Sequence, residues 1–134
     1  MIAPIRGRKF KIDLVNNKVS RLHQEITEKA IECTQINIDL QAIVAKRAEE
    51  KRPFTPEEVK AVEEYSQRVN EAKKMMVSNR WEIIKQLMVA NNIEFDFNFW
   101  DTKVSANDMN EFILFCIEND RNTFADGKST SKKK

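Results

Sequence analysis

The stretch Pro53-Phe54-Thr55-Pro56-Glu57-Glu58 decides the fold, because it combines several signals for the start of a helix. Thr55 is a favoured N-cap residue, and Glu58 follows three residues later, at the position that completes a capping box. Pro56 stands where a missing backbone N–H costs nothing. One long helix must therefore end near Arg52 and a second must begin near Pro56. This arrangement predicts a hairpin of two long helices.

Apolar residues on both sides of this stretch follow helical spacing. In the first helix, expected over residues 17–51, they recur in alternating steps of three and four, with Lys29 as the one polar exception. The seam consists of Val19, Leu22, Ile26, Cys33, Ile36, Leu40 and Ile43. The stripe of the second helix consists of Val62, Tyr65, Val69, Ala72, Met76, Ile83 and Leu87. A kink or restart at Ser78-Asn79 stays open, and Asn91-Asn92 is expected to end this helix.

Further apolar residues beside the first seam widen the stripe beyond what a partner helix covers. These residues are Ala30, Ile31, Ile38 and Val44. A third element or another subunit is expected to cover them.

The N-terminal residues 1–15 are expected to form a basic arm. Residues 1–8 look irregular, whereas Phe10, Ile12 and Leu14 alternate with polar residues at the period of a strand. Because one strand cannot satisfy its own edges, this segment is either a short strand paired with another segment or subunit, or an extended arm on the helices.

The aromatic segment 93–100 leaves two alternatives. Its alternation fits a strand, and Asp96 equally fits the cap of a short helical turn that carries Phe99 and Trp100. A last helix is expected to start at Ser105 and to fold back over the open end of the hairpin.

These patterns together predict an all-α fold. It is a long antiparallel helical hairpin over residues 17–91 with a smaller C-terminal helical cap over 93–120, within one helical domain of residues 16–120. Residues 121–134 lack apolar periodicity and are expected to be a disordered basic tail.

Charge is unevenly distributed in this chain of 134 residues. Residues 1–11 carry four basic and no acidic side chains, and residues 121–134 carry five basic and one acidic. The body, 12–120, carries 14 basic and 20 acidic side chains. An acidic body is unlike the basic face of a duplex-DNA binder, although the two ends leave contact with nucleic acid open.

No apolar run is long enough to span a membrane, and we expect a soluble, intracellular protein.

No residue pattern predicts catalysis, a metal site or a cofactor. The chain has only 2 glycines, too few for phosphate-binding loops, and its single histidine, His23, is expected at the edge of the helical seam. The cysteines, Cys33 and Cys116, are expected to be buried free thiols. Three glutamates on one helical face are expected to be solvated: Glu25, Glu28 and Glu32. We therefore expect a protein that is not an enzyme.

The aromatic segment is also a candidate for recognition. Its aromatic side chains alternate with Glu94, Asp96 and Asn98, and acidic neighbours repel phosphate. Core packing or an apolar docking patch for a protein is therefore favoured over a platform that stacks nucleic-acid bases.

Residues 81–120 carry a resemblance to a known family. The segment EIIKQLMVANNIEFD (82–96) leads into FNFWD (97–101) and, after a spacer, into NDMNEFILFCIEND (107–120), followed by a lysine-rich tail. This order resembles the C-terminal half of tail assembly chaperones from long-tailed phages, especially those that infect Gram-positive hosts.

The resemblance implies a chaperone that coats the long helical tape-measure protein during tail assembly. It implies a homo-oligomer in the bacterial host cytoplasm that is not retained in the mature virion. On this hypothesis the contact residues include Leu22, Ile26, Ile38 and Val44, or Phe95, Phe99 and Trp100. Two other classes stay open: a self-assembling coiled-coil scaffold, and a replication or transcription regulator that uses the basic ends.

Overall fold

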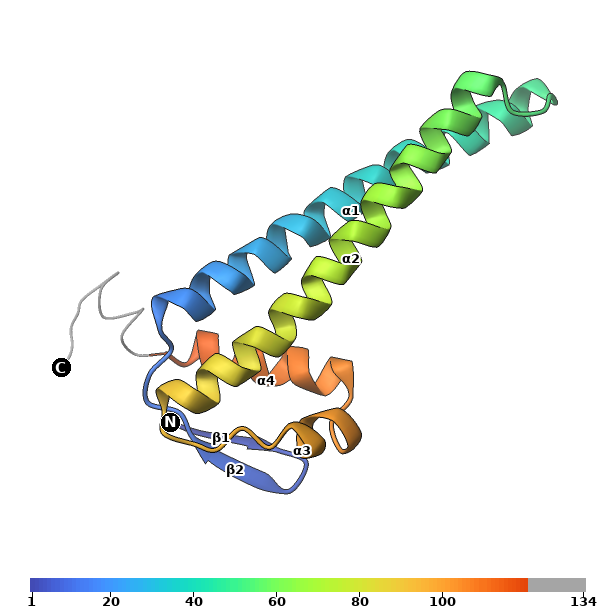
Figure 1. Ribbon diagram of the computed structural model, residues 1–134. Helices are drawn as coiled ribbons and strands as arrows, with labels where there is room; N and C mark the ends of the chain where they lie inside the picture. The colour runs from blue at the N-terminus through green and yellow to red at the C-terminus, as the bar shows by residue number, and fades with distance from the viewer. Residues whose placement is uncertain (121–134) are drawn as a thin grey trace. The chain divides into compact units, whose positions relative to one another are not determined.

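The computed structural model describes residues 1–120, so the expected tail lies outside the described residues. The elements, in chain order, are β1 (Ile2–Ile5), β2 (Arg8–Lys11), α1 (Asn17–Glu50), α2 (Pro56–Ala90), α3 (Phe97–Thr102) and α4 (Ala106–Glu118) (Figure 1). The two long helices, the smaller C-terminal helices and the short N-terminal strands confirm the predicted fold class. The chain divides into a hairpin unit (residues 24–79) and a terminal unit (residues 1–23 together with the chain from residue 80).

The capping box at the hairpin turn forms as predicted. The backbone N–H of Glu58 donates to Thr55 Oγ1 at 3.1 Å, and the backbone N–H of Thr55 donates to Glu58 Oε1 at 2.9 Å. Two of the unpaired donors at the start of α2 are thereby satisfied.

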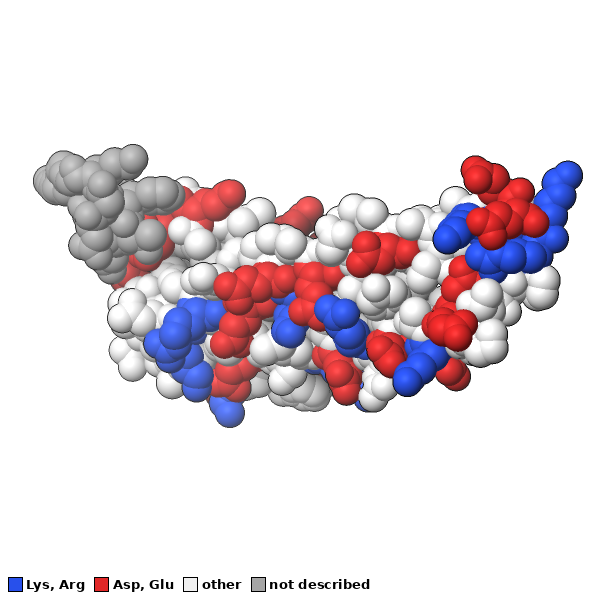
Figure 2. Space-filling model, turned by 90° about the horizontal axis from the view of Figure 1, so that it is seen from above, with Lys and Arg blue, Asp and Glu red and all other residues white. Residues whose placement is uncertain are grey.

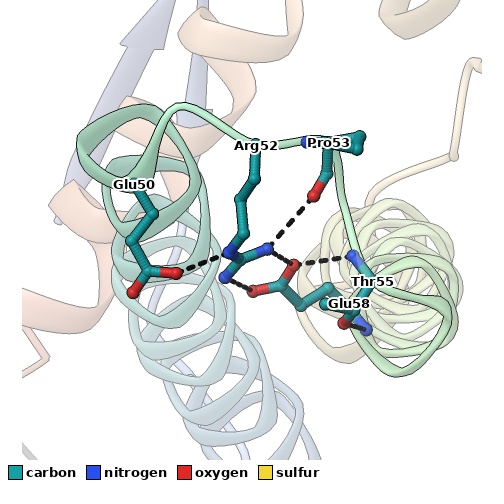
Figure 3. A network of polar contacts seen from close by, with 5 residues as sticks. All are labelled: Glu50, Arg52, Pro53, Thr55 and Glu58. Carbon is teal, nitrogen blue, oxygen red and sulfur yellow. Dashed lines mark hydrogen bonds and ion pairs between the residues drawn. The ribbon is translucent and has the colours of Figure 1, made fainter.

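An arginine that the sequence analysis did not single out clamps the same turn (Figure 3). The guanidinium of Arg52 donates to both carboxylate oxygens of Glu58, at 2.7 and 2.9 Å, and also to Glu50 at the end of α1. Hydrogen bonds from Arg52, and secondarily from the Thr55 backbone, lower the pKa of Glu58 to about 2. This clamp ties the end of α1 to the start of α2.

Helix α2 is continuous through Ser78 and Asn79, so the helix does not restart there. Asn79 is buried, and its side chain donates to Glu25 Oε1 on α1 at 2.9 Å rather than capping a new helix. A polar residue that resembles a cap in the sequence therefore serves as an interhelical contact.

The N-terminal segment differs from the expectation of an irregular stretch followed by a strand. Residues 2–5 form β1, which pairs antiparallel with β2, and β2 ends before Ile12. Arg6 and Gly7 have φ angles of 46° and 84°, the two positive values of a type I′ hairpin turn. Ala3 and Ile5 are buried. Their alternation is typical of a strand, but the sequence did not predict one here because Pro4 lies between them and proline is uncommon inside strands.

Asn91 fastens the link between β2 and α1. Its Oδ1 accepts from the backbone N–H groups of Asp13 and Leu14 at 2.8 and 2.9 Å, and its Nδ2 donates to the carbonyl of Leu14. The polar turn that ends α2 therefore also positions the start of the first helix.

The core of the terminal unit is aromatic at its centre. The Trp100 ring stacks on Phe10 at 5.8 Å between centroids and meets Phe99 and Phe112 edge-on. Asp96 caps α3 by accepting from the backbone N–H of Phe99 at 3.2 Å, which confirms the helical alternative for this segment.

Helix α4 begins at the predicted cap. Ser105 Oγ accepts from the backbone N–H of Asp108 at 3.0 Å. The helix contributes to the same core through Met109, Phe112, Ile113 and Cys116. In the described part of the chain, no helix combines the length and the hydrophobicity of a membrane span.

Candidate protein-binding surfaces

Two of the predicted contact residues belong to the core. Phe99 is 4% exposed and Trp100 is 1% exposed. Asp96 starts a helix immediately before them, and the turn of α3 points both side chains inward. In the folded terminal unit they are therefore packing residues rather than contact residues.

Phe95 instead joins an accessible cluster that the sequence analysis did not identify. Its ring lies 6.3 Å from Phe97 and 6.5 Å from Trp81, and Trp81 lies 5.1 Å from Phe97. Phe97 is 55% exposed, whereas Phe95 and Trp81 are half-buried. The helical period after the Asp96 cap was the available signal for Phe99, because residues two apart in a helix point to opposite sides, but it does not separate Phe97 from Trp100, three residues on. We call Trp81, Phe95 and Phe97 the aromatic cluster.

The second accessible apolar surface is on α1 in the hairpin unit. Ile31 is 65% exposed and Ile38 is 56% exposed. Residues seven apart lie within about 20° of each other on a helix, so Ile31, Ile38 and Ala45 form one stripe about 21 Å long. The exposed residues of α1 between 30 and 45 are all uncharged, and the two charged residues of this range, Glu32 and Asp39, are half-buried. We call this surface the uncharged α1 face.

The other predicted contact residues on α1 lie off this stripe. Val44 is 41% exposed but, at about 100° per residue, projects about 120° away from Ile38. Leu22 and Ile26 are half-buried in the seam. Of the four contact residues predicted on α1, only Ile38 lies on the uncharged α1 face, with Ile31 as its neighbour. Leu22, Ile26 and Val44 do not join it there.

The exposed side of α2 in the same unit has the opposite character. Its exposed charged residues are Glu57, Lys60, Glu63, Glu64, Arg68, Glu71, Lys73 and Lys74. In Figure 2, blue and red side chains also gather around the tip of the hairpin, at the right-hand end of the view. Within the hairpin unit, the exposed residues of α1 between 30 and 45 therefore lack the charge that α2 carries.

The glutamates of α1 are only partly solvated. Glu25 accepts from Asn79, and Glu32 accepts from Lys29 on α1 and from Arg68 on α2. The expectation of a solvated face holds for Glu28, which is exposed. Glu25 and Glu32 instead connect the two helices.

The seam between α1 and α2 is not closely packed throughout. A hollow of about 420 Å³ opens at the surface of the hairpin unit, lined by apolar Cys33, Leu40 and Val69 and by exposed Thr34, Asn37, Ser66, Asn70 and Lys73. The hairpin unit therefore has a thin core.

Among the described residues, no group of three or more His, Cys, Asp or Glu side chains is arranged to hold a metal ion. Partial burial lowers the pKa of His23, and burial raises the pKa of the Cys116 thiol to about 12. Cys33 is only half-buried, contrary to the expectation for both cysteines.

Comparisons with protein-family models, with curated protein sequences and with solved structures find no match to this chain.

Proposed function

We propose that this chain is a non-enzymatic tail assembly chaperone of a long-tailed phage, which binds and shields the helical tape-measure protein in the host cytoplasm. The observation that carries the proposal is the uncharged α1 face. In a chain with 33% charged residues, a stripe of exposed isoleucines without exposed charge is the surface suited to a helical client.

The small binding free energy expected for one contact with this surface suits reversible coating of a client. Burying one isoleucine side chain contributes at most about 1.5–3 kcal/mol, so a contact built on Ile31 and Ile38 is weak by itself. A long helical client offers many such contacts in series, and linked copies of the chaperone would gain affinity through effective concentration. We therefore expect weak single contacts, and a homo-oligomer that binds through several of them.

The resemblance of residues 81–120 to tail assembly chaperones supports the same proposal. The three quoted segments correspond to the end of α2, to α3 and to α4. They include Phe95 and Phe97 of the aromatic cluster, and Trp81 directly precedes them. The aromatic cluster offers a second apolar contact area for the client.

The first test is client recovery followed by a quantitative binding assay. The full chain and a 1–120 truncation, which keeps β1, β2 and the aromatic core, serve as baits in source cells, and the client's helical segment is then titrated against the double variant Ile31→Asp, Ile38→Asp. We expect both baits to recover one long helical protein and the double variant to bind at least tenfold more weakly with unchanged helicity.

Val77→Asp is the matched control, because Val77 is 44% exposed on α2, outside the uncharged face. Equal binding by the double variant would contradict the proposed surface. Recovery of nucleic acid by the full chain alone would contradict the proposed function and favour the basic C-terminal residues 121–134.

The same observation also favours a second candidate, a self-assembling scaffold. In that case the uncharged α1 face pairs with its copy in another subunit. A discrete oligomer that recovers no client and dissociates in the double isoleucine variant would assign the face to self-association.

A further inference from the structure

The terminal unit contains an open hollow of about 640 Å³ beside the β1–β2 turn. It is lined by Arg6, Gly7 and Arg8 of the turn and by Phe99 and Lys103 of α3 and its C-cap. Three cationic side chains from two separate chain segments therefore converge on one concave surface.

Arg8 is held in place on this surface by two contacts. Its guanidinium carbon lies 3.9 Å from the centroid of the Phe99 ring, and its Nη1 lies 3.3 Å from Asp96 Oδ2. Because Phe99 is buried and Asp96 caps α3, the guanidinium is fixed to rigid parts of the unit.

Arg6 occupies an unfavourable backbone position. It has a φ of 46° at the first central position of the turn, where glycine, asparagine and aspartate are preferred. Its Nε donates to the carbonyl of Lys103 at 3.2 Å and lies 3.7 Å from Asp108 Oδ2.

The two arginines keep donors available. Arg6 is anchored through Nε and Arg8 through Nη1, and no hydrogen bond within the described residues engages their other guanidinium nitrogens. Lys103 likewise has no side-chain ion pair within the described residues. Guanidinium groups that are already positioned bind planar oxyanions with little further ordering.

We propose that this hollow binds a single carboxylate from an acidic segment of a protein partner. Arg6, Arg8 and Lys103 supply three positive charges, and Asp96 and Asp108 offset two of them. A net charge of +1 matches one carboxylate. A nucleic-acid strand is a poorer fit, because it carries a charge on every successive phosphate and the hollow offers a net charge that matches only one anion. The site is separate from the uncharged α1 face and does not depend on the proposed function.

The test uses the full chain and a fluorescein-labelled twelve-residue peptide of alternating glutamate and serine. A glutamine peptide of the same pattern and a dT12 oligonucleotide serve as the comparison ligands. Two variants remove cations from the hollow: Arg6→Asn, which keeps a residue that the turn favours, and Lys103→Gln. Lys9→Gln is the matched control, because Lys9 is exposed on β2 but does not line the hollow.

We expect the glutamate peptide to bind and each of the two hollow variants to weaken it about tenfold, the effect of losing one charge-assisted hydrogen bond. Lys9→Gln should change affinity less than twofold, and Arg6→Asn should not lower the thermal midpoint. NMR signals of residues 6–8 and 103 should shift on binding.

Equal weakening by Lys9→Gln, or equal binding of the glutamine peptide, would overturn the proposal in favour of diffuse attraction. Tighter binding of dT12 that is lost in Arg6→Asn would overturn it in favour of a phosphate site. An absence of any binding by the glutamate peptide would overturn it outright.

Discussion

At the scale of single residues, Arg52 strengthens the start of α2 by binding Glu58, a residue of the capping box. Thr55 and Glu58 form a capping box that is visible in the sequence, and Arg52 adds a two-pronged contact to the same carboxylate. The carboxylate thereby accepts from both a side chain and the backbone, which explains why its pKa falls so far.

This pKa predicts a loss of stability in acid. Glu58 has a pKa of about 2 in the folded chain against an ordinary value of 4.5, so it stabilises the fold above pH 4.5, and this contribution is lost as pH falls through 2. We expect the difference in thermal midpoint between the full chain and Glu58→Gln to be largest near neutral pH and to shrink from pH 4.5 to 2. Glu57→Gln, an exposed neighbour in the same turn, is the control and should show no such trend.

The two thiols are expected to react differently. Burial raises the pKa of Cys116 to about 12, so at pH 8 it is almost wholly protonated as well as inaccessible, whereas Cys33 is half-buried. A chromogenic disulfide reagent should label one thiol quickly and the second only after unfolding, and Cys33→Ser should remove the quick phase. A quick phase that survives in Cys33→Ser would contradict the packing of α4.

At the scale of elements, α3 decides which aromatic residues are core and which are surface. The Asp96 cap starts a helix in the middle of the aromatic segment, so Phe99 and Trp100 enter the core, while Phe95 and Phe97 lie with Trp81. A single capping residue therefore divides one sequence motif between two structural roles.

The two tryptophans of the chain give a matched comparison of these roles. We expect Trp100→Ala to cost about 3–5 kcal/mol of unfolding free energy, because it empties a packed site between Phe10 and Phe112. Trp81→Ala removes a half-buried ring and should cost clearly less. Urea unfolding followed by far-ultraviolet circular dichroism measures both, and equal costs would contradict the distinction between core and cluster.

At the scale of the whole molecule, the two units differ in how much core each contains. Most fully buried apolar residues belong to the terminal unit, and in the hairpin unit only Ile36 and Ala72 join them among the described residues. The hollow near Cys33 and Val69 removes further packing from the hairpin unit.

This difference predicts uneven protection from hydrogen exchange. Amides of α1 and α2 between residues 30 and 75 should open with a lower free energy than those of residues 83–88, whose side chains include buried Ile83, Leu87 and Met88. Exchange followed by mass spectrometry on the full chain measures this directly. Uniform protection along α2 would show that the hairpin unit is as cooperative as the terminal unit.

The helical hairpin, both helix lengths, the Thr55–Glu58 capping box and the start of α4 could all be predicted from the sequence. These features depend on periodicity and on contacts between residues three or four apart, which a linear pattern records. The exposed position of Ile38 was predictable for the same reason, because it lies outside the seam.

The contact of Asn79 with Glu25 and the burial of Phe99 and Trp100 depend on the tertiary structure. It also brought Arg6 and Arg8 to Lys103, across more than ninety residues of sequence. Each of these features joins distant segments whose proximity no local spacing encodes. They form because burying the aromatic core brings those segments together, and polar side chains are then paired by the geometry that the core imposes.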